Sequence, residues 1–201
     1  VQTWKELNGI TCIDTSEIAN KQSICTSRSF GENVTDINPL RSAVANFAAS
    51  SANKLRGQHS VASAVTVFIM SNRFRDDLQQ YKNGLTRTLP VPTSDTIEIT
   101  KAALQIVDDI YIKGICYKKA GVVLSDITED TAIQQNLFDE IKNRPQRFML
   151  MNTIDKLNHR YGLKSIKLAV EGHDKETWHS KSEHRSGNYI SDINEIMRIK
   201  I

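Results

Sequence analysis

Residues 64–70 read Ala-Val-Thr-Val-Phe-Ile-Met. This run is short, continuously apolar and rich in β-branched residues, which is typical of a central strand buried by a helix. Three other stretches carry strand patterns of alternating or β-branched residues. They are residues 23–30, which Gly31 ends, residues 85–89, which stop at Pro90, and residues 117–127. The chain is therefore expected to build a sheet of four strands.

Two amphipathic helices are expected between these strands. Asn38 followed by Pro39 predicts the start of the first helix, with Asn38 as its N-cap, and Gly57 marks its end. Asp95, with Glu98 three residues later, predicts a capping box at the start of the second. Apolar residues recur at helical spacing in both, as Leu40, Val44, Phe47 and Leu55 and as Ile99, Ala103, Ile106 and Ile110. The order βαββαβ predicts an α+β fold, a ferredoxin-like four-stranded sheet with both helices on one face.

The second face of this sheet is expected to be open. Polar and cationic residues fall on its strands: Thr26, Ser27, Arg28, Thr86, Arg87, Lys118 and Lys119. Such a face is either a solvated surface or a ligand platform, and the fold alone favours the solvated surface. The net charge of +3 comes mostly from residues 23–128, which hold 12 Lys/Arg against 9 Asp/Glu, so nucleic-acid binding is permitted without being demanded.

Shorter patterns flank this domain on both sides. A brief helix is expected around Trp4 and Leu7, another over residues 146–158, and a strand over residues 165–170. The N-terminus shows neither an initiator Met nor a signal sequence, so we expect a part of a longer protein. The expected division is residues 1–22 as the end of a preceding domain with a linker, 23–128 as the main domain, 129–145 as a second linker and 146–201 as a C-terminal extension.

The composition favours an ordinary globular protein. The chain of 201 residues is 39% hydrophobic and 24% charged. No apolar run approaches the ~18 residues of a membrane span, so no membrane partner is expected. Cys12, Cys25 and Cys116 are widely spaced, which favours neither a disulfide framework nor a metal site and fits a reducing cytoplasm.

The sequence offers no convincing catalytic or metal site. Paired carboxylates occur at 76–77 and 108–109, and both pairs are interpreted as solvated charges, because a two-metal site also needs phosphate-holding partners. Three histidines of the polar tail lack the ordered spacing of a zinc site and are interpreted as surface residues: His173, His179 and His184. Glycine-rich phosphate loops and nucleophile elbows do not occur. No catalytic residue, metal or cofactor is therefore expected within this chain.

Residues 131–140 read Thr-Ala-Ile-Gln-Gln-Asn-Leu-Phe-Asp-Glu. Leu137 and Phe138 have no sequence neighbour that obviously buries them, so the segment suits docking into a groove of another protein. Gln134 would add a directional hydrogen bond. Packing of the Leu-Phe pair onto its own domain is the alternative.

Several ordered motifs carry a resemblance to a known family. They are Glu6-Leu7-Asn8-Gly9, Ser27-Arg28-Ser29-Phe30-Gly31, residues 89–96 (Leu-Pro-Val-Pro-Thr-Ser-Asp-Thr), residues 117–122 (Tyr-Lys-Lys-Ala-Gly-Val), Leu124-Ser125-Asp126 and residues 134–139. Together they make the chain resemble the C-terminal part of the UmuC-type, Y-family translesion DNA polymerases. Residues 146–201 resemble the extension that is specific to the UmuC type.

The resemblance implies a role for each part. Residues 23–128 would be the little finger, whose open face lies along template-primer phosphates. The implied DNA contacts are Ser27, Arg28, Ser29, Thr86, Arg87, Lys118 and Lys119. The sliding clamp would bind Gln134, Leu137 and Phe138, although Gln135 stands where the family usually has Leu. A UmuD-like subunit and a RecA filament are further implied partners, and Mg²⁺ is expected only in a palm domain upstream of residue 1.

Three functions are open on the sequence. The first is a non-catalytic DNA- and clamp-binding part of an error-prone polymerase in DNA repair and the SOS response. The second is a free-standing ferredoxin-like RNA-binding module, which would want paired aromatics on its central strands, and Phe30 and Tyr117 come nearest. The third is a small-molecule enzyme on the same scaffold, which the missing convergent polar residues disfavour.

Overall fold

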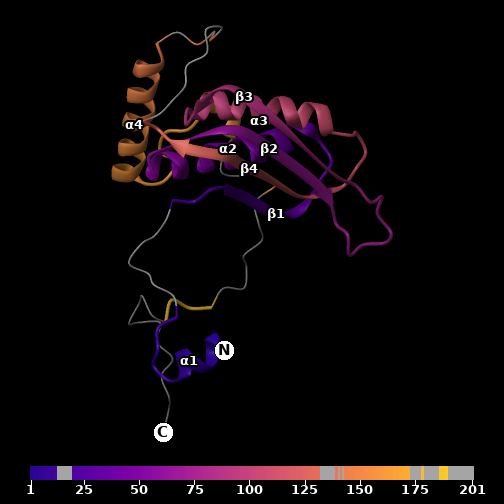
Figure 1. Cartoon of the computed structure of the whole chain (residues 1–201). Coiled ribbons are helices and arrows are strands. Elements are labelled where there is room, and N and C mark those ends of the chain that lie inside the picture. The colour runs from indigo at the N-terminus through magenta and orange to yellow at the C-terminus, as the bar shows by residue number, and fades with distance from the viewer. Residues whose placement is uncertain are drawn as a thin grey trace.

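A computed structural model of the chain describes residues 1–12, 20–131, 139, 141, 143–172, 178 and 186–189. The elements are α1 (Gln2–Leu7), β1 (Ile24–Val34), α2 (Ile37–Gly57), β2 (Ser60–Ser71), β3 (Lys82–Thr93), α3 (Thr96–Ile110), β4 (Tyr117–Glu129), α4 (Arg144–Tyr161) and the 3-10 turn η1 (Ala169–Glu171). Figure 1 shows α2 and α3 on the same side of the sheet, with α4 beside the end of the domain. None of the described helices is long and apolar enough to cross a membrane.

The strands form one sheet in the order β1-β4-β2-β3, and every neighbouring pair is antiparallel. Each helical crossover therefore skips one strand: β4 lies between β1 and β2, and β2 lies between β3 and β4. The predicted α+β fold with two helices on one face is confirmed. The run at 64–70 is a central strand, as expected, because it carries side chains that α2 and α3 bury.

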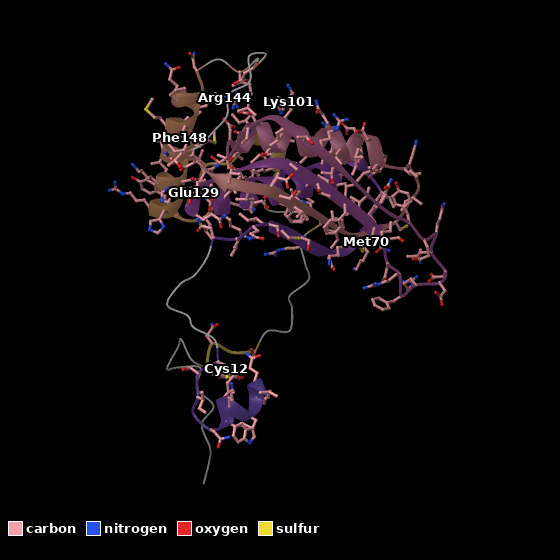
Figure 2. The ribbon with its side chains drawn as sticks, viewed as in Figure 1. Cys12, Met70, Lys101, Glu129, Arg144 and Phe148 are labelled. Carbon is pink, nitrogen blue, oxygen red and sulfur yellow. The ribbon has the colours of Figure 1, made fainter. Side chains whose placement is uncertain are left out.

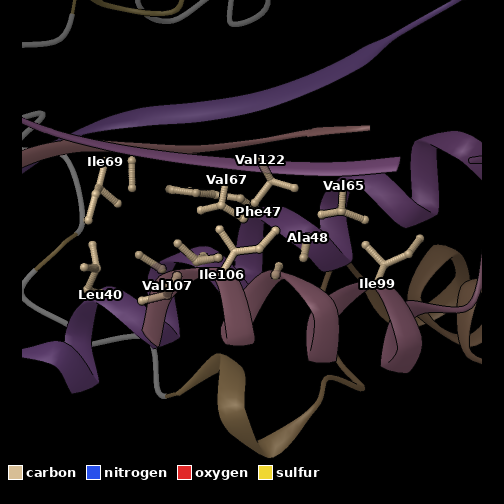
Figure 3. Close-up of a cluster of buried hydrophobic side chains, with 14 of the residues drawn as sticks. Leu40, Phe47, Ala48, Val65, Val67, Ile69, Ile99, Ile106, Val107 and Val122 are labelled. Carbon is tan, nitrogen blue, oxygen red and sulfur yellow. The ribbon is translucent and has the colours of Figure 1, made fainter. Parts of the chain in front are cut away.

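The core lies between the sheet and the two helices (Figure 3). Val65, Val67 and Ile69 of β2 are fully buried against it. The predicted stripes of both helices meet them there, including Leu40 and Ile106. Each of these large apolar side chains contributes roughly 1.5 to 3 kcal/mol by leaving water. The alternation of β2 is therefore fixed by burial rather than by its turns.

Two strand ends differ from the prediction. β1 does not end at Gly31 but continues to Val34, and its pairing with β4 shifts register between Ser29 and Val34. β3 begins at Lys82 and continues past Pro90 to Thr93. Proline is tolerated there because β3 is an edge strand, where a missing N–H costs no ladder bond on the free side.

The helix starts also differ in detail. The N-cap of α2 is Asp36, so Asn38 lies inside the first turn. Asp95 caps α3 as predicted, accepting from the backbone N–H of Ile97 at 2.7 Å. The reciprocal half of the capping box is replaced, because the Asp95 N–H donates to the Thr93 hydroxyl at 3.1 Å.

The C-terminal extension packs on the helices. The helix expected over residues 146–158 is confirmed as α4, but the strand expected over residues 165–170 is wrong, since η1 lies there instead. Its position follows from polar anchors on α2: Ser42 Oγ and Asn46 Nδ2 donate to the Glu171 carbonyl at 2.9 and 2.5 Å. The buried Trp178 completes the contact, with its ring edge-to-face against Phe47 at 5.7 Å between centroids.

Ion pairs fasten α4 to the start of α3 and the end of α2. Arg56 donates to both carboxylate oxygens of Asp155 at 2.6 and 2.9 Å and to the Ser94 carbonyl at 2.6 Å. Arg147 pairs with Asp95 at 2.6 Å. Burial raises the pKa of Glu98 even though Arg144 of α4 opposes that effect. α4 is therefore held by directed polar contacts around the buried Met151.

Replacing Asp155 with Ala is expected to lower the free energy of unfolding by about 1–3 kcal/mol, because it leaves the guanidinium of Arg56 partly unpaired where that side chain is 6% exposed. Urea unfolding followed by circular dichroism measures the change. Asp77→Ala is the matched control, because Asp77 pairs with Arg75 in an exposed loop, where such pairs contribute little. Equal losses from both substitutions would contradict a special role of the Arg56–Asp155 pair.

Candidate nucleic-acid interface

Strand register sorts the side chains of the sheet into two faces. Val65, Val67 and Ile69 face the helices, so Thr66, Phe68 and Met70 face the other way. Pairing extends this side across all four strands. In the order β1, β4, β2, β3 its rows are Ser29, Lys119, Met70 and Lys82; Ser27, Gly121, Phe68 and Gly84; Cys25, Val123, Thr66 and Thr86; and, without a β1 member, Ser125, Ala64 and Thr88. These positions are called the open face below.

The open face is cationic and hydroxyl-rich. Lys119 and Lys82 stand in the same row, on either side of Met70. Ser27, Ser29 and several threonines surround them, and none of the positions of the open face carries a carboxylate. A surface of this kind favours an anionic ligand and offers hydroxyl donors to it.

One aromatic ring lies flat in the centre of this face. A Cβ added at Gly121 would stand 2.4 Å from Cζ of Phe68 and 2.6 Å from Cβ of Ser27. A Cβ at Gly84, on the other neighbouring strand, would stand 3.2 Å from Cβ of Phe68. Glycine is therefore needed at position 121, where only hydrogen leaves room for the ring. The result is a smooth middle row between the lysine row and the threonine row.

Four of the residues predicted to contact DNA lie on the open face. They are Ser27, Ser29, Thr86 and Lys119. The hydroxyls of Thr86 and Thr66 are 2.8 Å apart, which ties β3 to β2 across this surface. Lys82 and Phe68 were missed by the sequence reasoning. Lys82 was assigned to a loop, and only the strand pairing shows that both residues share a face with Lys119.

Three residues expected on the open face lie on the opposite side, so that expectation is wrong for them. Arg87 faces the helices and donates to the Asp109 carboxylate of α3 at 2.6 Å. Thr26 accepts a hydrogen bond from Ser51 of α2 at 2.8 Å. Arg28 is exposed but pairs with Ala120, whose side chain belongs to the core side. The reason is the strand period of two, since direct neighbours in sequence point to opposite faces.

Lys118 lies at an irregularity rather than within the regular ladder. The pairing of β4 with β2 shifts register between Met70 and Ser71, which leaves Lys118 without a regular partner. Its ammonium donates to the Gly31 carbonyl of β1 at 3.2 Å. This lysine therefore holds the irregular part of β1 against β4.

The paired carboxylates are exposed, and three of the four acids have cationic partners. Asp108 pairs with Arg41, Asp109 with Arg87 and Asp77 with Arg75. In the part of the chain that the structure describes, no group of three His, Cys, Asp or Glu side chains could hold a metal ion. The three tail histidines and the predicted clamp contacts Gln134, Leu137 and Phe138 lie outside the described residues.

Comparison with known proteins gives the family. Residues 21–137 match the impB/mucB/samB family C-terminal domain, and residues 149–199 match a domain of unknown function (DUF4113). The protein UmuC of Salmonella typhimurium is 36% identical over 99% of this chain, and the protein ImpB of the same organism is 37% identical over 97%. The chain covers 47% and 46% of these two relatives, so it spans about half of their length.

A solved structure, the insertion ternary complex of Dbh DNA polymerase, is 12% identical, covers 53% of this chain and 29% of its own, and gives a TM-score of 0.39. The family assignment depends instead on the domain match, which takes in more than half of the chain. It agrees with the motifs at Ser27-Arg28-Ser29 and Tyr117-Lys118-Lys119. The chain therefore belongs to the UmuC-type impB/mucB/samB family and carries that family's C-terminal domain.

Proposed function

We propose that this chain is the DNA-binding and clamp-binding C-terminal part of an error-prone translesion DNA polymerase. The observation that carries the proposal is the open face, where Lys82 and Lys119 share a row and no carboxylate occurs. A rigid sheet holds these groups, so little ordering is needed when a phosphate backbone binds.

The open face suits phosphates rather than bases. Lysine ammonium groups act as point charges, and serine or threonine hydroxyls add short hydrogen bonds. Contacts of this kind fix the position of a duplex but carry no sequence information. A polymerase that copies past damage needs such indifference, because its template changes at every step.

The RNA-binding alternative finds less support. It requires a pair of accessible aromatics on the central strands. Phe30 and Tyr117 are 2% and 0% exposed, so neither ring can stack on a base. Among the described positions of the open face, Phe68 is the one aromatic residue, and it lies flat over Gly121.

The wider setting belongs to the same proposal. The resemblance supports action in DNA repair and the SOS response within the cytoplasm, with the sliding clamp, a UmuD-like subunit and a RecA filament as partners. Catalysis and its Mg²⁺ ions would belong to palm carboxylates that are not among these residues. The role of this chain would be to hold template-primer DNA and the clamp.

DNA binding should depend on salt and on the lysine row. If about three or four phosphates are neutralised, log K should fall with log salt at a slope of roughly −3. Lys119→Gln and Lys82→Gln should each weaken binding to any sequence and flatten that slope by about one unit. Fluorescence anisotropy with labelled duplexes at several salt concentrations measures both effects.

Lys101→Gln is the matched control, because it makes the same charge change on α3. Figure 2 shows Lys101 on the helix side of the domain and Met70 at the far end of the sheet. The control should leave the salt slope unchanged. If Lys101→Gln weakens binding as much as Lys119→Gln, general charge and not the open face holds the DNA.

No nucleotidyl transfer is expected from these 201 residues with any divalent ion. Asp108 and Asp109 already pair with Arg41 and Arg87, so they are poorly placed to share a metal ion. Primer extension is the measurement. Template-dependent incorporation that is lost on changing Asp108 or Asp109 would contradict this expectation.

The peptide at 134–138 should dock into the sliding clamp. Burying a large apolar side chain contributes roughly 1.5 to 3 kcal/mol, so changing Leu137 and Phe138 together to Ala should abolish detectable binding. Gln134→Ala should cost about 1 kcal/mol for one hydrogen bond, and Gln135→Leu should tighten binding. Surface plasmon resonance on immobilised clamp measures each affinity.

The melting temperature of the Leu137/Phe138 double variant provides the control. An unchanged melting temperature with lost clamp binding supports an exposed docking peptide. Unaltered clamp binding with a clear loss of thermal stability would show that the Leu-Phe pair packs on its own domain.

A further inference from the structure

The loop between β2 and β3 presents an aromatic side chain to solvent. Phe74 is 84% exposed, although large apolar residues are seldom left so open without a function. The guanidinium of Arg73 lies over the ring, 5.4 Å from its centroid. Figure 1 shows this loop extending from the end of the sheet and bending away from α2 and α3.

The loop is held in place by its own hydrogen bonds. Gln80 Nε2 donates to the carbonyls of Asn72, Arg75 and Leu78 at 3.1, 2.8 and 3.2 Å. The hydroxyl of Tyr81 at the base of the loop donates to the Ile110 carbonyl at 2.6 Å, which fixes the loop to the end of α3. The exposure of Phe74 therefore comes from an organised loop, so binding through it would cost little ordering entropy.

Strand register places this loop next to the lysine row. Met70 pairs with Lys82, which is the last regular pair before the loop, and Lys119 lies on the other side of Met70. Phe74 follows Met70 by four residues, a span of at most about 14 Å. That distance corresponds to roughly four base-pair steps of duplex. Nucleic acid on the open face would thus reach Phe74 at its end.

We propose that Phe74 stacks on an unpaired base of the DNA whose phosphates the open face holds, with Arg73 supporting the ring. Aromatic side chains beside arginine bind unpaired bases of any sequence through stacking and cation–π contacts. This inference rests on the proposed DNA binding by the open face. A single-stranded extension is favoured over a protein partner because the nearest neighbours of the loop on the sheet are Lys82 and Lys119, which attract phosphate.

The test compares a blunt duplex with the same duplex carrying a short single-stranded extension that has 2-aminopurine at its first unpaired position. The extension should tighten binding to this chain, and Phe74→Ala should remove that gain, a loss of about ten-fold, while affinity for the blunt duplex stays unchanged. Emission of 2-aminopurine should be quenched by the unaltered chain and by Phe74→Trp but not by Phe74→Ala. Phe74→Leu is the matched control, since it keeps an apolar side chain without a ring, and it should behave like Phe74→Ala.

The two proposals fail in different ways. Absence of any duplex binding, or duplex binding that ignores Lys119→Gln, would overturn the proposed function together with this inference. Normal duplex binding with an extension gain that survives Phe74→Ala would overturn the stacking role alone and leave Phe74 as a contact for protein. Melting temperatures of the Phe74 variants should match that of the unaltered chain, because so exposed a side chain adds little to stability.

Discussion

The burial of one side of β2 under α2 and α3 is the constraint on which the rest of the structure depends. Val65, Val67 and Ile69 leave water completely, and each contributes roughly 1.5 to 3 kcal/mol. Because a strand alternates with a period of two, their burial fixes Thr66 and Phe68 on the opposite face. Antiparallel pairing then passes the same choice to the neighbouring strands. A register slip of one residue would exchange the two faces everywhere, at the full cost of the core.

Charge is segregated by this alternation. Thr86 and Arg87 are neighbours in sequence, yet the first lies on the open face and the second pairs with Asp109 on the helix side. Several of the acids lie on that side as well, where arginine guanidinium groups partner them. A chain whose net charge is only +3 thereby presents a face without carboxylates, on which two lysines are the local charge. Local sign matters more than net charge for holding a phosphate backbone.

The C-terminal extension is attached through the helices and not through the sheet. Arg56 and Asp155 pair at the end of α2, and the carbonyl of Glu171 accepts two donors from its middle. Trp178 adds an aromatic contact with Phe47. These anchors are directional and partly buried, so they fix an orientation as well as adding stability. The extension thus has its described contacts on the side of the domain opposite to the proposed DNA surface.

The sequence by itself determined the order of the elements, the apolar stripes of both helices, the central position of residues 64–70 and the family, because periodicity and motifs are local in the chain. It did not determine which side Arg28 and Arg87 take, nor that Lys82 and Phe68 join Lys119, since these depend on pairing between strands far apart in sequence. The strand expected over residues 165–170 was wrong for the same reason: donors on α2, more than one hundred residues earlier, hold that segment as a turn. Only the tertiary structure decided the composition of the open face, because register is a property of the whole sheet.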